Sequence, residues 1–178
     1  MWYPATETAA PANEPVTLEE AKRHLRVFHS DEDDYIDALI ATARDHVEKY
    51  CGARWAEIEL VANCDDWCDL SLLPVTPVTA LTSIAYTDAD GAPAVVDGAV
   101  YEFRADARAV VLKPGQHWPV KQHGSRITVT MAAGAEDVPP AVKHAILLRV
   151  EDFYEHRGSE EDSKWSSFDS LLSNYRFY

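Results

Sequence analysis

The chain has 178 residues, 47% of them hydrophobic, which suits one compact domain or a domain with an inserted module. Its formal net charge of −14 argues against a protein that grips nucleic acid through its phosphates, but allows one that lets DNA pass, since like charges repel. Three cysteines are a poor disulfide framework and predict a reducing compartment. No apolar run of transmembrane length and no signal-peptide pattern is present, which predicts synthesis in the cytoplasm.

The first residues, 1–15, contain three prolines among Ala, Thr and Glu and show no periodicity. We therefore expect a flexible arm, since such a segment cannot bury enough apolar surface to fold. Trp2 and Tyr3 are unusual in an arm of this kind. They leave a second interpretation open, in which the aromatic pair anchors the arm onto a partner or onto the domain itself.

Two helices are predicted after the arm. Thr17 begins a capping-box pattern, which predicts a short amphipathic helix over residues 18–28. Its apolar stripe consists of Leu18, Ala21, Leu25 and Phe28. A longer helix is predicted over residues 31–51, with Ser30 as its N-cap and Gly52 as its left-handed stop. The apolar side chains of the longer helix recur at helical spacing and form one stripe: Ile36, Leu39, Ile40, Ala43, Val47 and Tyr50. Other elements must cover this stripe.

After Gly52 the periodicity changes from that of a helix to that of strands. Alternating residues predict strands over 58–62 and 67–72, and Asp88 to Gly91 reads as a hairpin turn. Further strands are predicted at 81–86, 95–96, 100–103, 109–112 and 126–131. Short strands at this spacing are typical of a small antiparallel sandwich or barrel.

Helical periodicity returns over residues 139–157, where a proline in the first turn is favourable, and a charged loop precedes the last apolar residues. The predicted class is α+β: a helical bundle formed by the N- and C-terminal helices, with an inserted small antiparallel β-sandwich or barrel module. The predicted divisions are a flexible arm (1–15), the helical bundle (16–57 and 135–164), the inserted β module (58–134) and a C-terminal docking segment (165–178).

The sequence offers little catalytic chemistry. It has no glycine-rich phosphate loop and no His-Glu-x-x-His motif. Cys64 and Cys68 would need Cys51 or a histidine to complete a zinc site, and small buried side chains explain them more simply. Carboxylate runs at residues 31–34 and 160–162 have the chemistry to hold a nuclease metal, although solvated charge is the simpler interpretation. We predict no cofactor, no metal and no catalytic residue.

A set of short motifs follows in order along residues 15–176. They are Val16 to Lys22 with His24-Leu25, Asp33 to Ile36, Leu39-Ile40, Ala43-Arg44, Val47-Glu48, Leu73-Pro74, Pro77-Val78, Ser83-Ile84 with Tyr86, Trp118-Pro119, Ala133-Gly134, Val138-Pro139, Ala145-Ile146, Leu171-Leu172 and Tyr175-Arg176. This ordered set resembles the head–tail connector, or adaptor, proteins of tailed bacteriophages and of phage-derived gene transfer particles. No single motif decides the resemblance.

The resemblance implies a helical bundle with a β insertion, no enzymatic activity, and a ring, usually of twelve copies, beneath the portal. The ring would extend the DNA channel and dock the next neck protein. The implied partners are the portal protein, a neck, stopper or tail-terminator protein, other copies of the chain, and DNA that passes without specific binding; no membrane is implied. The implied location is the neck of a virion or phage-like particle assembled in the bacterial cytoplasm.

Two sets of site residues follow as predictions. Large apolar groups and an arginine near the C-terminus are the portal-docking candidates: Trp165, Phe168, Leu171, Leu172, Tyr175, Arg176, Phe177 and Tyr178. The channel-lining acidic candidates are Asp31, Glu32, Asp33, Asp34, Glu160, Glu161 and Asp162. An alternative for Phe168, Leu171 and Leu172 is that they complete the core of their own chain.

Two other function classes remain open at this point. One is a small metal-dependent nuclease that uses the acidic clusters. The other is a chaperone or regulator that binds one protein partner as a monomer.

Overall fold

The computed structural model describes residues 1–135, 137–156 and 167–177. These residues form two compact units. Residues 1–11 and 57–135 make up the first, here called the β unit, and the described residues within 12–56 and 137–177 make up the second, here called the helical unit. The mixed α+β class with antiparallel sheets is confirmed.

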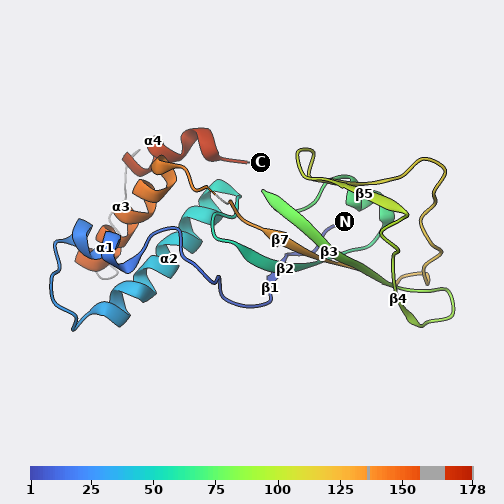
Figure 1. The fold of residues 1–178 in the computed structure, drawn as a ribbon, viewed down its shortest axis with the longest axis horizontal. Helices are drawn as coiled ribbons and strands as arrows, with labels where there is room; N and C mark the ends of the chain where they lie inside the picture. The colour runs from blue at the N-terminus through green and yellow to red at the C-terminus, as the bar shows by residue number, and fades with distance from the viewer. Residues whose placement is uncertain (136, 157–166, 178) are drawn as a thin grey trace. The chain divides into compact units, whose positions relative to one another are not determined.

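The β unit is built on one antiparallel sheet (Figure 1). Its strands lie in the order β1 (Thr6–Glu7), β2 (Ile58–Cys64), β7 (Ile127–Ala133), β3 (Val78–Thr87) and β4 (Pro93–Val95). A separate antiparallel pair is formed by β5 (Tyr101–Arg104) and β6 (Ala109–Leu112). The sheet ends at β1 and β4, so it does not close into the barrel that was one of the two predicted forms.

Alternation along the strands explains how the β unit forms its core. In β7, Ile127, Val129 and Met131 are buried, and the residues between them are partly exposed. Residues on one face of a strand are two positions apart, so this pattern turns one apolar face of the sheet inward. Leu70 and Leu73, from the connection after β2, join the same core.

The strand predicted over residues 67–72 is wrong, because Trp67–Ser71 forms a 3₁₀ helix. Asp66 caps this turn: its side chain accepts the N–H of Trp67 at 2.7 Å, and the Asp69 side chain accepts the N–H of Asp66 at 3.0 Å. Local carboxylate-to-backbone bonds of this kind compete with a strand ladder and favour a turn. The alternation of apolar residues was therefore outweighed by the flanking aspartates.

The N-terminal residues also differ from the expected flexible arm. Thr6–Glu7 pairs with β2 as strand β1, and Trp2 forms a bridge with Cys64. The indole N–H of Trp2 donates to the carbonyl oxygens of Leu72 at 2.8 Å and Asp69 at 3.0 Å. The structure thus favours the alternative interpretation in which the aromatic pair anchors the arm onto its own chain.

The helical unit contains α1 (Leu18–Leu25), α2 (Asp33–Cys51), α3 (Pro140–His156) and α4 (Ser167–Leu172), with a 3₁₀ turn at Ser173–Tyr175. Helix α2 packs against α1 and α3, and α4 packs on α3 (Figure 1). The apolar stripes of α2 and α3 supply the core through side chains that are almost fully buried: Ile36, Ile40, Val47, Val142, Ile146 and Val150. The capping box at Thr17 and the left-handed stop at Gly52 are confirmed.

Both ends of the α1–α2 connection differ from the prediction. Helix α1 ends at Leu25 because Arg26 adopts the left-handed conformation, with φ 59°, and its N–H bonds back to the carbonyl of Arg23. Phe28 therefore lies outside the helix and is 88% exposed instead of joining the apolar stripe. Helix α2 begins at Asp33 rather than at residue 31, and Ser30 does not cap it.

Candidate functional site

The predicted docking segment lies against helix α2 of its own unit. The Phe168 ring packs edge-on against Tyr50, with ring centroids 5.2 Å apart, and contacts His46 at 5.6 Å. Leu172 is fully buried. The Tyr50 hydroxyl donates to the Asp169 carboxylate at 2.7 Å, which fixes α4 over the C-terminal half of α2.

The last described residues wrap the end of α2. Tyr175 packs edge-on against Trp55 at 5.9 Å, and the Arg176 guanidinium lies 4.8 Å from the centre of the Tyr50 ring. The backbone N–H of Phe177 donates to the carbonyl of Cys51 at 2.7 Å. This carbonyl is one of those that the helix end leaves unpaired, so the chain end itself acts as its partner.

These contacts divide the docking candidates into two groups. Of the three residues in the alternative interpretation, Leu172 is buried in the core of its own unit, whereas Phe168 and Leu171 are half-buried, as is Tyr175. Arg176 is exposed, and Phe177 keeps 46% of its surface open to solvent. Trp165 and Tyr178 lie outside the described residues.

Glu48, near the end of α2, is a buried carboxylate that the sequence analysis did not single out as a site. One of its oxygens accepts from Arg44 at 2.9 Å and Arg54 at 3.0 Å. The other accepts the backbone N–H groups of Trp55 at 2.7 Å and Ala56 at 3.1 Å. Glu48 therefore shapes the turn that carries Trp55, the residue on which Tyr175 packs. Only its i,i+4 spacing from Arg44 was visible in the sequence.

Arg44 links this cluster to residues before α1. Its Nε donates to Glu14 at 2.9 Å. Burial would lower the pKa of Arg44, but the charges of Glu48 and Glu14 outweigh it and raise that pKa. Burial raises the pKa of Glu14, against the opposing charge of Arg44. Arg44 and Glu14 are thus two partly buried charges of opposite sign, and each offsets the cost of burying the other.

His46 and Arg149 form a second polar contact beneath α4. The Nη2 of Arg149 lies 3.0 Å from Nε2 of His46, so the arginine donates and the histidine accepts as a neutral ring. The same guanidinium lies 5.1 Å from the Phe153 ring centre and 5.3 Å from that of Phe168. Burial, and then the charge of Arg149, lower the pKa of His46.

The acidic residues at the start of α2 do not all face solvent. Asp33 forms an ion pair with Lys22 of α1. Glu32 accepts a hydrogen bond from the Tyr154 hydroxyl of α3 at 2.6 Å. Asp34 is exposed, and the side chain of Asp31 is 90% exposed. The candidates Glu160, Glu161 and Asp162 lie outside the described residues.

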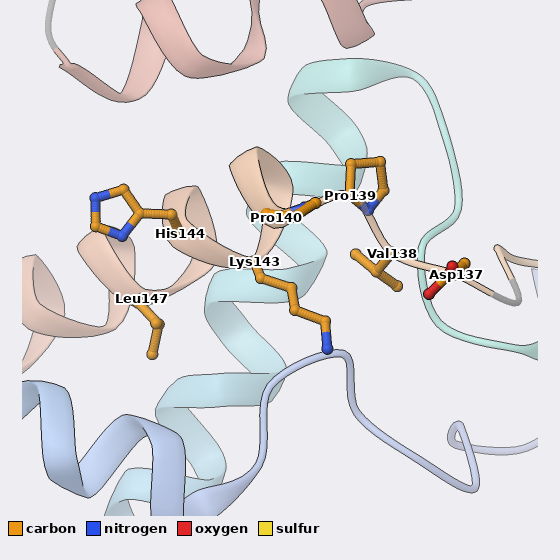
Figure 2. A pocket seen from close by; sticks show the side chains of 7 residues that line it. All are labelled: Asp137, Val138, Pro139, Pro140, Lys143, His144 and Leu147. Carbon is orange, nitrogen blue, oxygen red and sulfur yellow. The ribbon is translucent and has the colours of Figure 1, made fainter.

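A surface pocket lies at the start of α3 and is called the α3 pocket here (Figure 2). It measures about 490 Å³ and is lined by Asp137, Val138, Pro139, Pro140, Lys143, His144 and Leu147. Lys143 and Leu147 project from the same side of the helix, one turn apart, and His144 points to another side. The lining thus combines apolar side chains with the carboxylate of Asp137, the cation of Lys143 and the imidazole of His144. No sequence pattern predicted this pocket.

The described ranges hold neither a metal-binding cluster nor a membrane-spanning helix. Among those residues, no three His, Cys, Asp or Glu side chains gather closely enough to hold a metal ion. None of the helices within them combines the length and hydrophobicity that a bilayer-spanning segment needs.

Comparison with known families gives a match over residues 15–91, to the family described as "Phage gp6-like head-tail connector protein". The resemblance to head–tail connector proteins is confirmed. The matched stretch contains α1, α2 and the first strands of the β insertion, including the landmarks from Val16 to Tyr86 on which the resemblance rested. None of the curated proteins matches the sequence.

Solved structures extend the similarity in fold to almost the whole chain. A chain from the neck of an empty gene transfer agent (GTA) particle, computed with C6 symmetry, superposes with a TM-score of 0.83 at 20% identity, covering 99% of this chain and 96% of that one. A chain from the virion of a native GTA particle gives 0.81 at 20% identity, covering 98% and 95%. One from the neck of a native GTA particle, computed with C12 symmetry, gives 0.81 at 20%, covering 99% and 96%. The fold is therefore one that occurs in such particles.

Proposed function

We propose that this chain is a structural head–tail connector protein of a phage or phage-like particle. It assembles as a ring beneath the portal, extends the DNA channel and docks the next neck protein. Twelve copies is the number that the resemblance to head–tail connectors implies, and one neck chain with this fold comes from a particle computed with C12 symmetry. The observation that carries the proposal is the family match over residues 15–91. The similarity in fold to neck chains of GTA particles, across both units, supports it.

Fewer residues remain as portal-docking candidates than the sequence suggested. Leu172 is buried and Phe168 packs against Tyr50 of α2, so Arg176 and Phe177 are the exposed docking candidates among the described residues. An arginine beside an exposed aromatic ring is a common centre of binding energy in protein interfaces. We assign the portal contact to this pair, with Trp165 and Tyr178 as further candidates.

The list of channel-lining candidates is also shorter than the sequence suggested. Asp31 and Asp34 are the exposed carboxylates at the start of α2 and are the candidates for the wall that DNA passes, together with Glu160, Glu161 and Asp162. Like charge along a channel wall keeps duplex DNA from adhering to it. The isolated chain should therefore show no salt-sensitive binding to duplex DNA, and tight binding that weakens steeply with salt would contradict this role.

The experiment that tests the whole proposal is co-assembly with the portal protein of the same particle. The purified chain is mixed with portal rings and the product is imaged by electron microscopy. A second ring coaxial with the portal is the expected result. A chain that binds the portal only as single copies would favour the regulator class. A divalent-metal-dependent cleavage of DNA, lost in Asp33→Asn, would favour the nuclease class.

A further inference from the structure

Phe28 is the most exposed large apolar side chain in the described ranges, at 88%. Its neighbour Val27 is buried, and the N–H of Val27 donates to the carbonyl of Lys22 at 2.9 Å. The Lys22–Asp33 ion pair closes the same connection. The ring of Phe28 therefore projects from a firmly held turn and not from a loose loop. A side chain presented in this way loses little conformational freedom when it binds.

The α3 pocket is a hollow in the surface, whereas Phe28 projects from it, and several residues that line the pocket are apolar. Val138, Pro139, Pro140 and Leu147 give it apolar walls, which suit an aromatic ring. Phe28 is not among the lining residues, and its exposure means that it does not fill the pocket of its own chain. The projection and the pocket thus lie on different parts of the same unit.

Charges beside the two features are complementary. Phe28 lies between Arg26 and Asp31, both exposed. The pocket has a carboxylate, Asp137, and a cation, Lys143, whose charge helps to lower the pKa of Glu20 in the same chain. Insertion of Phe28 into the pocket of the next copy would bring Arg26 beside Asp137, which pairs opposite charges. For a chain of net charge −14, such pairing also reduces the repulsion between neighbouring copies.

We propose that Phe28 of one copy inserts into the α3 pocket of the next copy, and that this contact joins neighbouring subunits of the ring. The inference rests on the proposed connector function and names an interface within it. A contact between two unlike surfaces of identical chains is heterologous, and such contacts give a ring when the rotation between neighbours closes and a filament when it does not. The GTA neck structures with this fold were computed with six- and twelvefold symmetry, as expected for ring-forming chains.

Disulfide trapping tests the contact in the full chain. The background is Cys68→Ser, because Cys68 is exposed, whereas Cys51 and Cys64 are buried. Arg26→Cys and Asp137→Cys, at the two positions that the contact brings together, are introduced singly and together so that Phe28 is kept, and the concentrated proteins are oxidised mildly. The double variant should give a ladder of dimers, trimers and larger species. The two single variants should cross-link only when mixed, and then stop at dimers.

A matched substitution provides a second readout. Phe28→Ser should reduce self-association of the chain, measured by sedimentation, at least tenfold. Val120→Ser, which removes a 77% exposed apolar side chain from the β unit, should leave it unchanged. Equal effects of both substitutions, cross-linking within each single variant, or no ladder from the double variant would overturn the proposed contact. Co-assembly of the unaltered chain with the portal is scored separately, so a ring formed without this contact would leave the connector function standing.

Discussion

The carbonyl oxygen of Phe177 lies 2.5 Å from the position that a β-carbon on Gly52 would occupy. Gly52 has a positive φ of 67°, so it also holds a backbone conformation that side chains disfavour. The helix stop and the binding of the chain end therefore depend on the same missing side chain. This relationship connects the end of α2 to the proposed portal contact.

Gly52→Ala should detach the last residues and destabilise the helical unit. The left-handed conformation alone costs about 1–2 kcal/mol for a residue with a β-carbon, and displacement of Phe177 adds to it. Urea unfolding measures the free energy, and carboxypeptidase digestion reports release of the chain end. Gly98→Ala is the control, because its φ is not positive and its β-carbon would meet no atom within 4 Å. An equal effect at both glycines would contradict the explanation.

Deletion of residues 174–178 should leave a folded chain that no longer joins the portal. Some stability is lost, since the Tyr175–Trp55 contact and the Phe177 N–H bond to Cys51 disappear. The buried Leu172 and the contact of Phe168 with Tyr50 remain. Circular dichroism checks folding, and co-sedimentation with portal rings measures attachment. Full attachment of the truncated chain would remove the segment from the docking surface, as would loss of folding before a partner is added.

Glu48→Ala should be among the most damaging single substitutions in the helical unit. It leaves Arg44 and Arg54 without their shared carboxylate, and removal of one member of a buried ion pair typically costs about 3–5 kcal/mol. Asp45→Ala, on the same helix, removes only an exposed pair with Lys49 and should cost about 0.5 kcal/mol or less. Denaturant unfolding measures the free energy of unfolding of both variants. Similar losses in the two would show that the buried ion pairs of Glu48 contribute no more to stability than the exposed pair of Asp45.

Stability should fall with acidification through His46. Its folded-state pKa is lowered by burial and by Arg149, so the unfolded chain binds a proton that the folded chain disfavours. The contribution of His46 to the free energy of unfolding is therefore fully present above the ordinary histidine pKa of about 6.5. This contribution is lost as the pH falls below that value towards the lowered pKa of the folded state. Asp45 and Asp152 oppose this shift, and Lys49 adds to it.

The measurement is the urea midpoint between about pH 7.5 and about pH 5.5, the range in which histidines titrate. His46→Gln should reduce the acid loss, because glutamine still accepts a hydrogen bond but cannot take up the proton. His123→Gln, at an exposed position, is the control and should keep the loss of the unaltered chain. An identical pH dependence in all three proteins would show that His46 does not contribute.

The regular elements of this fold were largely predictable because each carries a local signal. The capping box at Thr17, the stripe through Ile36 and Ile40, and the alternation in β7 all involve residues close in sequence. The barrel alternative failed because closure of a sheet depends on how its edge strands pair, which alternation does not encode.

Features that depend on distant residues were not predictable in the same way. Glu48 looked like an ordinary charged helical residue, and only the fold brings Arg54 and two backbone N–H groups to it. Phe28 was assigned to a helix stripe because its spacing fits, but the left-handed Arg26 ends the helix first. The α3 pocket depends on side-chain shape at the surface, for which periodicity gives no signal.

The pairing of Thr6–Glu7 with β2 has a consequence for how copies of this chain meet. An open sheet edge is a template on which another chain can add a strand and begin uncontrolled aggregation. Here one edge is the two-residue β1, and the other is the three-residue β4, which begins with Pro93. Short edges and an edge proline both discourage strand addition. Copies at high concentration therefore do not add strands to one another edge to edge and grow into fibrils. Side-chain contacts then decide how the copies assemble.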